Sequence, residues 1–159
     1  MSIDTISIAK DKNDAEDMLA LLSDELESAD DAGWKVVIGH YPCHSGGYYA
    51  GIHSMRESVC PVLEENSVDF YLTGHDHNQQ HWVKKGDASA VEHVVTGAGG
   101  QNRYHKNDDN VEENEKLGME LKFFDDIYGF SYFVVGKEEM KLQIVNMNGE
   151  VMHEPIRYK

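Results

Sequence analysis

The sequence predicts an α/β fold in which a βαβαβ part is followed by antiparallel strands. Two amphipathic segments of helical periodicity separate three short apolar runs of strand type, which lie at residues 2–8, 34–39 and 68–72. Strands that are separated by helices usually pair in parallel, because the helix carries the chain back to the same edge of the sheet. Nearer the C-terminus, Asn148-Gly149 lies between two further strand-like runs, which is the strongest short signal for an antiparallel hairpin.

Composition narrows the classes of protein and partner. A chain of 159 residues with 40% hydrophobic content fits one domain or part of one. Its formal charge of −15 argues against nucleic acid and anionic membrane as partners. No apolar run approaches the ~18 residues of a membrane span, and no signal-peptide core follows Met1.

The two helices are expected at residues 14–29 and 55–66. Asn13 with Glu16, and Ser54 with Glu57, have the spacing of capping boxes at their starts. Pro61 removes a backbone hydrogen bond, so the second helix should kink or stop early.

The C-terminal half is expected to be built from hairpins. Residues 80–84 and 91–96 should pair, and residues 140–146 should pair with 150–157 across Asn148-Gly149. The polar, acidic segment 101–118 has no apolar periodicity and is interpreted as an exposed, mobile loop. Two more strands are expected at residues 119–124 and 127–135.

Three histidines mark the candidate functional site. His40 follows strand 34–39 in a Gly-His corner, and His75 and His77 follow strand 68–72 in a second corner. Loops beyond the ends of neighbouring parallel strands lie side by side, and neutral imidazole is a common ligand of first-row transition metals. The pattern therefore predicts a metal site formed by these three residues.

The motifs GHYP at residues 39–42 and GHDHN at 74–78 resemble the C-terminal half of metallophosphoesterases, also called calcineurin-like phosphoesterases. The resemblance is strongest to purple, or tartrate-resistant, acid phosphatases, and it covers nearly the whole chain. It implies a β-sandwich of two mixed sheets flanked by helices, of which residues 1–159 supply the C-terminal part of a single domain. The family's N-terminal motifs have no counterpart here, so the chain is expected to be a fragment or an incomplete gene model.

The resemblance also implies the chemistry. His40 and His75 match ligands of a divalent metal and His77 a ligand of ferric iron, in a dinuclear centre of Fe(III) with Fe(II), Zn or Mn. The implied reaction is hydrolysis of a phosphate monoester, with in-line attack by metal-bound hydroxide. Because only half of that site is present, the isolated chain is expected to be inactive. Asp76 and Asn78 are expected to order the loop.

A nearby position departs from the family pattern. Mammalian-type enzymes carry a histidine where this chain has Tyr49, and tyrosine is a weaker acid than imidazolium. We therefore expect His53 or His44, rather than Tyr49, to assist the leaving group. Because no motif surrounds the other histidines, we expect no functional role for His81, His93, His105 and His153.

Two alternatives remain open at the level of the sequence. The fold could be retained without activity in an interaction or scaffold protein, or the chain could be a simple zinc or iron binder. The family resemblance implies a secreted, lysosomal or vacuolar setting. The sequence does not decide the substrate, the oligomeric state, or whether Cys43 and Cys60 pair.

Overall fold

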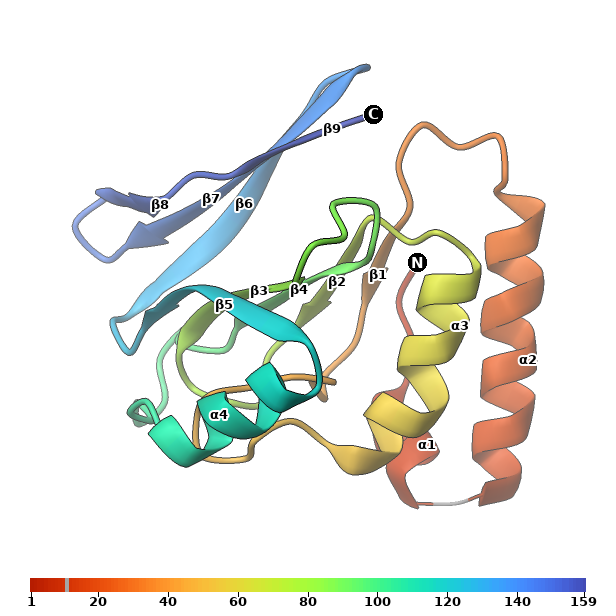
Figure 1. Cartoon of the computed structure of the whole chain (residues 1–159), viewed down its shortest axis with the longest axis horizontal. Coiled ribbons are helices and arrows are strands. Elements are labelled where there is room, and N and C mark those ends of the chain that lie inside the picture. Colours follow the sequence, from red (N-terminus) through yellow and green to blue (C-terminus); the bar gives the residue numbers. More distant parts are fainter. Residues whose placement is uncertain (11) are drawn as a thin grey trace.

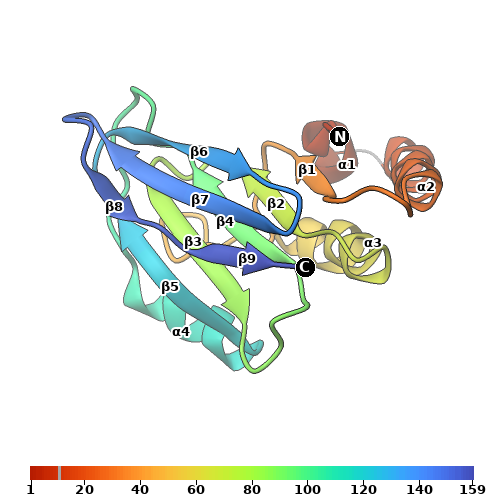
Figure 2. The same ribbon diagram turned by 90° about the horizontal axis from the view of Figure 1, so that it is seen from above.

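The computed structural model describes residues 1–10 and 12–159, and the side chains of residues 12–14 are also outside the description. Three layers are visible: helices, a five-stranded sheet and a four-stranded sheet (Figures 1 and 2). Figure 2 shows the second sheet, β6 to β9, stacked over the first. The α/β class and the two-sheet architecture expected from the sequence are therefore confirmed.

The first sheet has the strand order β1-β2-β4-β3-β5. Strands β1 (Val36–Ile38), β2 (Phe70–Thr73) and β4 (Glu92–Thr96) are parallel. Strand β3 (Gln79–Lys84) runs antiparallel to β4 and to β5 (Met119–Asp125). The predicted parallel pair and the predicted hairpin at residues 80–96 are both present.

The second sheet is antiparallel throughout the described chain. It consists of β6 (Gly129–Val135), β7 (Glu139–Asn146), β8 (Val151–His153) and β9 (Ile156–Tyr158). The turn at Asn148-Gly149 joins β7 to β8, and Gly149 adopts φ +82°, which a residue without Cβ tolerates. The predicted hairpin is confirmed, although two short strands form its second arm.

Alternation along the strands builds two cores. Phe70 of β2 packs between the sheets with Val94, Met140, Leu142 and Ile144. Tyr71, one residue on, faces the opposite side of the sheet, as the period of a strand requires. That second core contains side chains from the helices, and its buried members include Leu22, Leu26, Met55, Val59 and Leu63.

The N-terminal segment corrects one prediction. The sequence predicts a strand at residues 2–8, but Thr5–Lys10 is a helix, α1, and only Ser2 forms an isolated bridge to β1. The carboxylate of Asp4 accepts hydrogen bonds from the backbone N–H groups of Ile6 and Ser7, at 3.0 and 3.2 Å. This N-cap provides partners for two backbone N–H groups that would otherwise be unpaired. It therefore favours a helix, although the β-branched residues of the segment favour a strand.

The two predicted helices are present with altered starts. Helix α2 spans Lys12–Ser28, and the proposed cap at Asn13 depends on a side chain outside the described ones. The second helix begins as a π-helical turn, η1 (Met55–Val59), and continues as α3 (Cys60–Glu65). The capping box at Ser54 is wrong, because this residue is itself helical and its side chain makes no capping bond to the described residues. Pro61 lies in the first turn of α3, where a missing N–H is tolerated, directly after the irregular turn.

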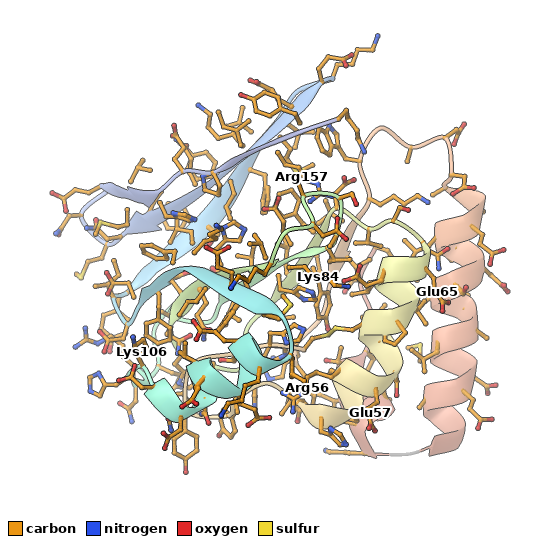
Figure 3. The ribbon with its side chains drawn as sticks, viewed as in Figure 1. Arg56, Glu57, Glu65, Lys84, Lys106 and Arg157 are labelled. Atoms are coloured by element: carbon orange, nitrogen blue, oxygen red, sulfur yellow. A yellow bond between two sulfur atoms is a disulfide. The ribbon has the colours of Figure 1, made fainter. Side chains whose placement is uncertain are left out.

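The segment 101–118 corrects a second prediction, because it contains a helix, α4 (Asp108–Lys116). Asn107 caps it by accepting hydrogen bonds from the N–H groups of Asp109 and Asn110. Figure 3 shows Arg56 of η1 near α4, where it forms an ion pair with Glu113 at 3.2 Å. In the described part of the chain, none of the helices is both long enough and apolar enough to cross a membrane.

Candidate metal centre

The candidate centre lies where β1 and β2 end. Because these strands are parallel, the loops that follow them leave the same edge of the sheet. The N–H of Gly39 donates to Leu72 O at 2.9 Å and that of Gly74 donates to His40 O at 3.2 Å, which ties the two loops together. As a result, His40 Nε2 lies 3.2 Å from His75 Nδ1, a separation at which both nitrogens can face one ion.

His75 has the electrostatic and backbone features of a positioned ligand. Its φ of +64° is uncommon for a residue with a Cβ and directs the side chain out of the strand axis. Partial burial, reinforced by His40 and His77, lowers its pKa to about 4. The ring is therefore neutral at ordinary pH and keeps a lone pair for a cation, which is the form that metal ligation requires.

The contacts that orient the His77 ring differ from those of His40 and His75. His77 Nδ1 lies 2.7 Å from the backbone oxygen of Asn102, and its ring stacks on Tyr104 at 4.4 Å with an interplanar angle of 11°. The N–H of Tyr104 also donates to His77 O at 3.0 Å. A carbonyl acceptor on one ring nitrogen fixes the tautomer, so Nε2 is left with its lone pair for a ligand.

The side chain of Asp76 organises the neighbouring loop, which begins with His40. Its buried carboxylate accepts hydrogen bonds from the hydroxyl of Ser45 and from the N–H groups of Tyr48 and Tyr49, the last two at 3.0 and 3.4 Å. Burial raises the pKa of this carboxyl, while the hydrogen bonds counteract part of that effect. These contacts support the loop-ordering role expected for Asp76.

Asn78 and Gly97 complete the packing beneath the histidines. The amide of Asn78 donates to Tyr104 O at 3.1 Å, which is the side chain to backbone bond expected of it. A Cβ on Gly97 would lie 2.0 Å from Asp76 O, so only glycine allows β4 to approach the histidine loop this closely.

The three residues proposed to assist the leaving group lie in different surroundings. Tyr49 is adjacent to the centre, with its ring 4.1 Å from that of His75. His44 is buried, its Nδ1 lies 2.8 Å from Asn114 Oδ1, and burial lowers its pKa to about 4. His53 is exposed and pairs with Glu57. Of the three, Tyr49 has the described contact with the candidate centre, although the sequence favours His53 or His44. Which of them affects turnover stays a prediction.

Sequence reasoning missed Asn102 and Tyr104, because they lie in the segment that lacks apolar periodicity and is predicted to be a mobile loop. Tyr104 is an aromatic residue in a mostly polar and acidic segment, and that contrast was the available signal. Asn102 acts through its backbone oxygen, which no side-chain pattern reveals.

The two cysteines form a disulfide, a pairing that the sequence does not decide. Cys43 lies in the loop that begins with His40, and Cys60 is the first residue of α3. The bond therefore fixes the loop of the candidate centre to the helical layer.

Comparison with known proteins shows the family and the fold. Residues 1–79 match the family described as calcineurin-like phosphoesterase. Purple acid phosphatase 17 of Arabidopsis thaliana is 33% identical over 129 residues, which cover 80% of this chain and 36% of that protein. The chain thus spans about a third of the length of this relative.

Two solved structures show the same fold. GAP50, described as the anchor in the inner membrane complex of Plasmodium, aligns with a TM-score of 0.78 and 24% identity, over 99% of this chain and 48% of its own. Purple acid phosphatase PPD1 from yellow lupin (Lupinus luteus) seeds aligns with a TM-score of 0.73 and 16% identity, over 87% of this chain and 28% of its own. From its matching family, its relatives and its fold, the chain belongs to the calcineurin-like phosphoesterases.

Proposed function

We propose that this chain forms part of the active site of a metal-dependent phosphomonoesterase of the acid phosphatase type. The observation that carries the proposal is the 3.2 Å approach of His40 Nε2 to His75 Nδ1. His77 follows in the same loop as His75, and its ring is held by Asn102 O. A scaffold has no need to keep three imidazoles at one sheet edge, two of them with neighbouring ring nitrogens.

His40 and His75 would hold one metal, and His77 would hold its neighbour. The neutral form of His75 and the carbonyl-fixed tautomer of His77 fit this role. We assign the His77 position to Fe(III) and the other to Fe(II), Zn or Mn. Two adjacent cations in such a centre polarise phosphoryl oxygens and lower the pKa of bound water.

The residues of this chain would orient the phosphate ester and confine its binding to the metal centre. With a formal charge of −15, the protein repels a phosphate at long range, so the centre must supply the local attraction. The Tyr49 ring, next to His75, is positioned to contact a phosphate oxygen or the leaving group. His44 and His53 stay alternatives for that role, with contacts that are less favourable.

We further propose that ligands from outside residues 1–159 complete the site and that these residues form the C-terminal part of one domain. The share of the plant relative that is matched, 36%, supports this interpretation. Residues 1–159 alone should then retain metal weakly and hydrolyse p-nitrophenyl phosphate negligibly. Robust turnover by this stretch would contradict the proposal.

The test uses the protein with the complete domain. His75→Ala should lower p-nitrophenyl phosphate turnover at acid pH at least ~100-fold and reduce the metal content measured by mass spectrometry. His105→Ala is the matched control, because it also removes an imidazole. This histidine is exposed, pairs with Asp126 and belongs to neither proposed metal position. If His75→Ala keeps full activity, the assignment of the centre is wrong.

The second candidate function is an interaction protein without activity. The fold likeness to GAP50, described as an anchor, favours it. A protein with the complete domain that carries no metal and no phosphatase activity would support this alternative. A secreted, lysosomal or vacuolar setting is proposed for either function, and the Cys43–Cys60 disulfide is consistent with an oxidising compartment.

A further inference from the structure

A second group of metal-ligating side chains lies in the core between the first sheet and α3. It consists of Cys43, Cys60 and His93, whose sulfur atoms and one ring nitrogen all lie within 4.8 Å of one another. Cys43 is fully buried and His93 is 3% exposed. The three residues come from the loop after β1, the start of α3, and β4, so the fold itself brings them together.

His93 has an unused bonding capacity. Its Nδ1 is buried and has no hydrogen-bond partner among the described residues. Leaving such a nitrogen unpaired costs about 1–3 kcal/mol, so the position calls for a reason beyond packing. Burial, with smaller effects from His44 and His81, holds the pKa of His93 well below its ordinary value. The imidazole is therefore neutral, as a metal ligand must be.

We propose that Cys43, Cys60 and His93 form a second metal site once their disulfide is reduced, and that the site takes a thiolate-preferring ion such as Zn²⁺. Thiolates with imidazole are the ligand set that selects Zn²⁺ and Cu⁺ over Mg²⁺ or Ca²⁺. Two thiolates, a neutral imidazole and Zn²⁺ sum to zero charge, which an apolar core tolerates. The fourth ligand of the ion would be water or His44, whose ring centroid lies 4.9 Å from that of His93.

The disulfide and a bound metal ion exclude each other, because both use the sulfur atoms of Cys43 and Cys60. A dithiol reductant would supply two electrons and two protons, break the Sγ–Sγ bond, form two thiols and end as its own disulfide. When Zn²⁺ binds, the two thiol protons pass to solvent. The sulfurs then separate to roughly 3.8 Å, as a tetrahedral site with Zn–S bonds of ~2.3 Å requires. The cluster is thus a redox-gated site whose ligands are separate from the histidines of the candidate phosphatase centre.

The experiment uses Co²⁺ as a spectroscopic substitute for Zn²⁺. The purified protein is reduced with a phosphine, desalted without oxygen and titrated with Co²⁺. The expected result is a sulfur-to-cobalt charge-transfer band in the near ultraviolet that saturates at about one ion per chain and is absent from the oxidised protein. Co²⁺ at His40, His75 and His77 gives no such band, because these ligands are nitrogens. Failure of the phosphatase proposal would therefore leave this readout unchanged.

His93→Leu should weaken Co²⁺ binding at least ~10-fold in the reduced protein, whereas the exposed-histidine variant His105→Ala should bind as the wild type does. X-ray absorption of the reduced wild-type protein, loaded with one equivalent of Zn²⁺, should show two sulfurs and at least one imidazole. That second measurement decides the question if His93→Leu does not fold. A reduced protein without the sulfur band, or a zinc shell without imidazole, would overturn the proposal.

Discussion

Gly97 shows how a single residue without a side chain sets the geometry of the centre. An added Cβ would lie 2.0 Å from the backbone oxygen of Asp76, between the two histidines of the second corner. Backbone cannot yield as a flexible side chain can, so the strand or the loop must move.

Gly97→Ala should therefore destabilise the protein by about 1–3 kcal/mol in urea unfolding and weaken metal binding. Gly99→Ala is the matched control, because its Cβ meets nothing within 4 Å among the described atoms. Equal stability of the two variants would show that the close approach at Gly97 is unimportant.

His44 makes stability depend on pH. Burial lowers its pKa from 6.5 to about 4, so the unfolded chain binds the proton more readily than the folded one between these values. Stability from this residue is complete above pH 6.5 and is lost as the pH falls toward 4.

Between pH 7 and pH 5 the loss should be roughly 2 kcal/mol, at about 1.4 kcal/mol per pKa unit. His44→Gln removes the titrating group, so its free energy of unfolding, measured in urea, should fall less over this range. The exposed His53→Gln is the control and should keep the wild-type slope. Parallel pH profiles for His44→Gln and the wild type would contradict the assignment.

At the scale of elements, sequence patterns predict the strands and long helices and fail where a short polar side chain decides the outcome. The strands at residues 34–39 and 68–72 are present because their apolar runs supply side chains to the cores on both faces of the sheet. The sequence patterns miss helices α1 and α4, because their apolar residues do not recur at clear helical spacing. The caps at Asp4 and Asn107 start these helices instead.

The candidate metal centre shows the same contrast between what local sequence patterns predict and what they miss. The two Gly-His corners indicate His40, His75 and His77, because parallel strands deliver their loops to one edge. Contacts from distant segments, such as Asn102 O on His77 and Asn114 on His44, depend on tertiary packing that no local pattern encodes.

Asn114 makes α4 a support for the loop of the candidate centre. Its fully buried amide group donates to Ser45 O, Ala50 O and Asn110 O at 3.0, 3.3 and 2.8 Å, and its Oδ1 faces His44 Nδ1. Removing it takes a hydrogen-bond partner from Ser45 O and from the His44 imidazole, whereas Ala50 O keeps its hydrogen bond from Arg56.

Asn114→Ala should lower the free energy of unfolding by roughly 2–3 kcal/mol, because each buried polar group left unpaired costs about 1–3 kcal/mol. Glu115→Ala, on the exposed side of the same helix, should change it by less than ~0.5 kcal/mol. Denaturation in urea measures both. Were Asn114→Ala as stable as Glu115→Ala, α4 would have no supporting role.

At the scale of the whole molecule, buried ion pairs attach the C-terminal strand to the first sheet. Arg157 of β9 donates to Asp69 at 3.2 Å, to Glu92 at 3.1 Å and to Ala90 O at 2.9 Å. Figure 3 shows Arg157 between the two sheets. Both Asp69 and the Arg157 side chain are largely removed from solvent, so water replaces a lost partner poorly. Without Arg157, the Asp69 carboxylate would keep the more exposed Lys159, whose Nζ lies 3.2 Å away.

Arg157→Met should keep most of the packing volume while leaving Asp69 and Glu92 with one cation fewer. Breaking a buried pair from one side costs about 3–5 kcal/mol, so we expect a destabilisation of that size in urea unfolding. Arg103→Met removes a more exposed arginine, 3.8 Å from Asp126, and should cost under ~1 kcal/mol. Since the Arg157 contacts join the two sheets, hydrogen exchange in β9 should accelerate in Arg157→Met ahead of exchange in β2. Unchanged protection of β9 would show that the apolar core between the sheets, and not this ion-pair network, holds the second sheet in place.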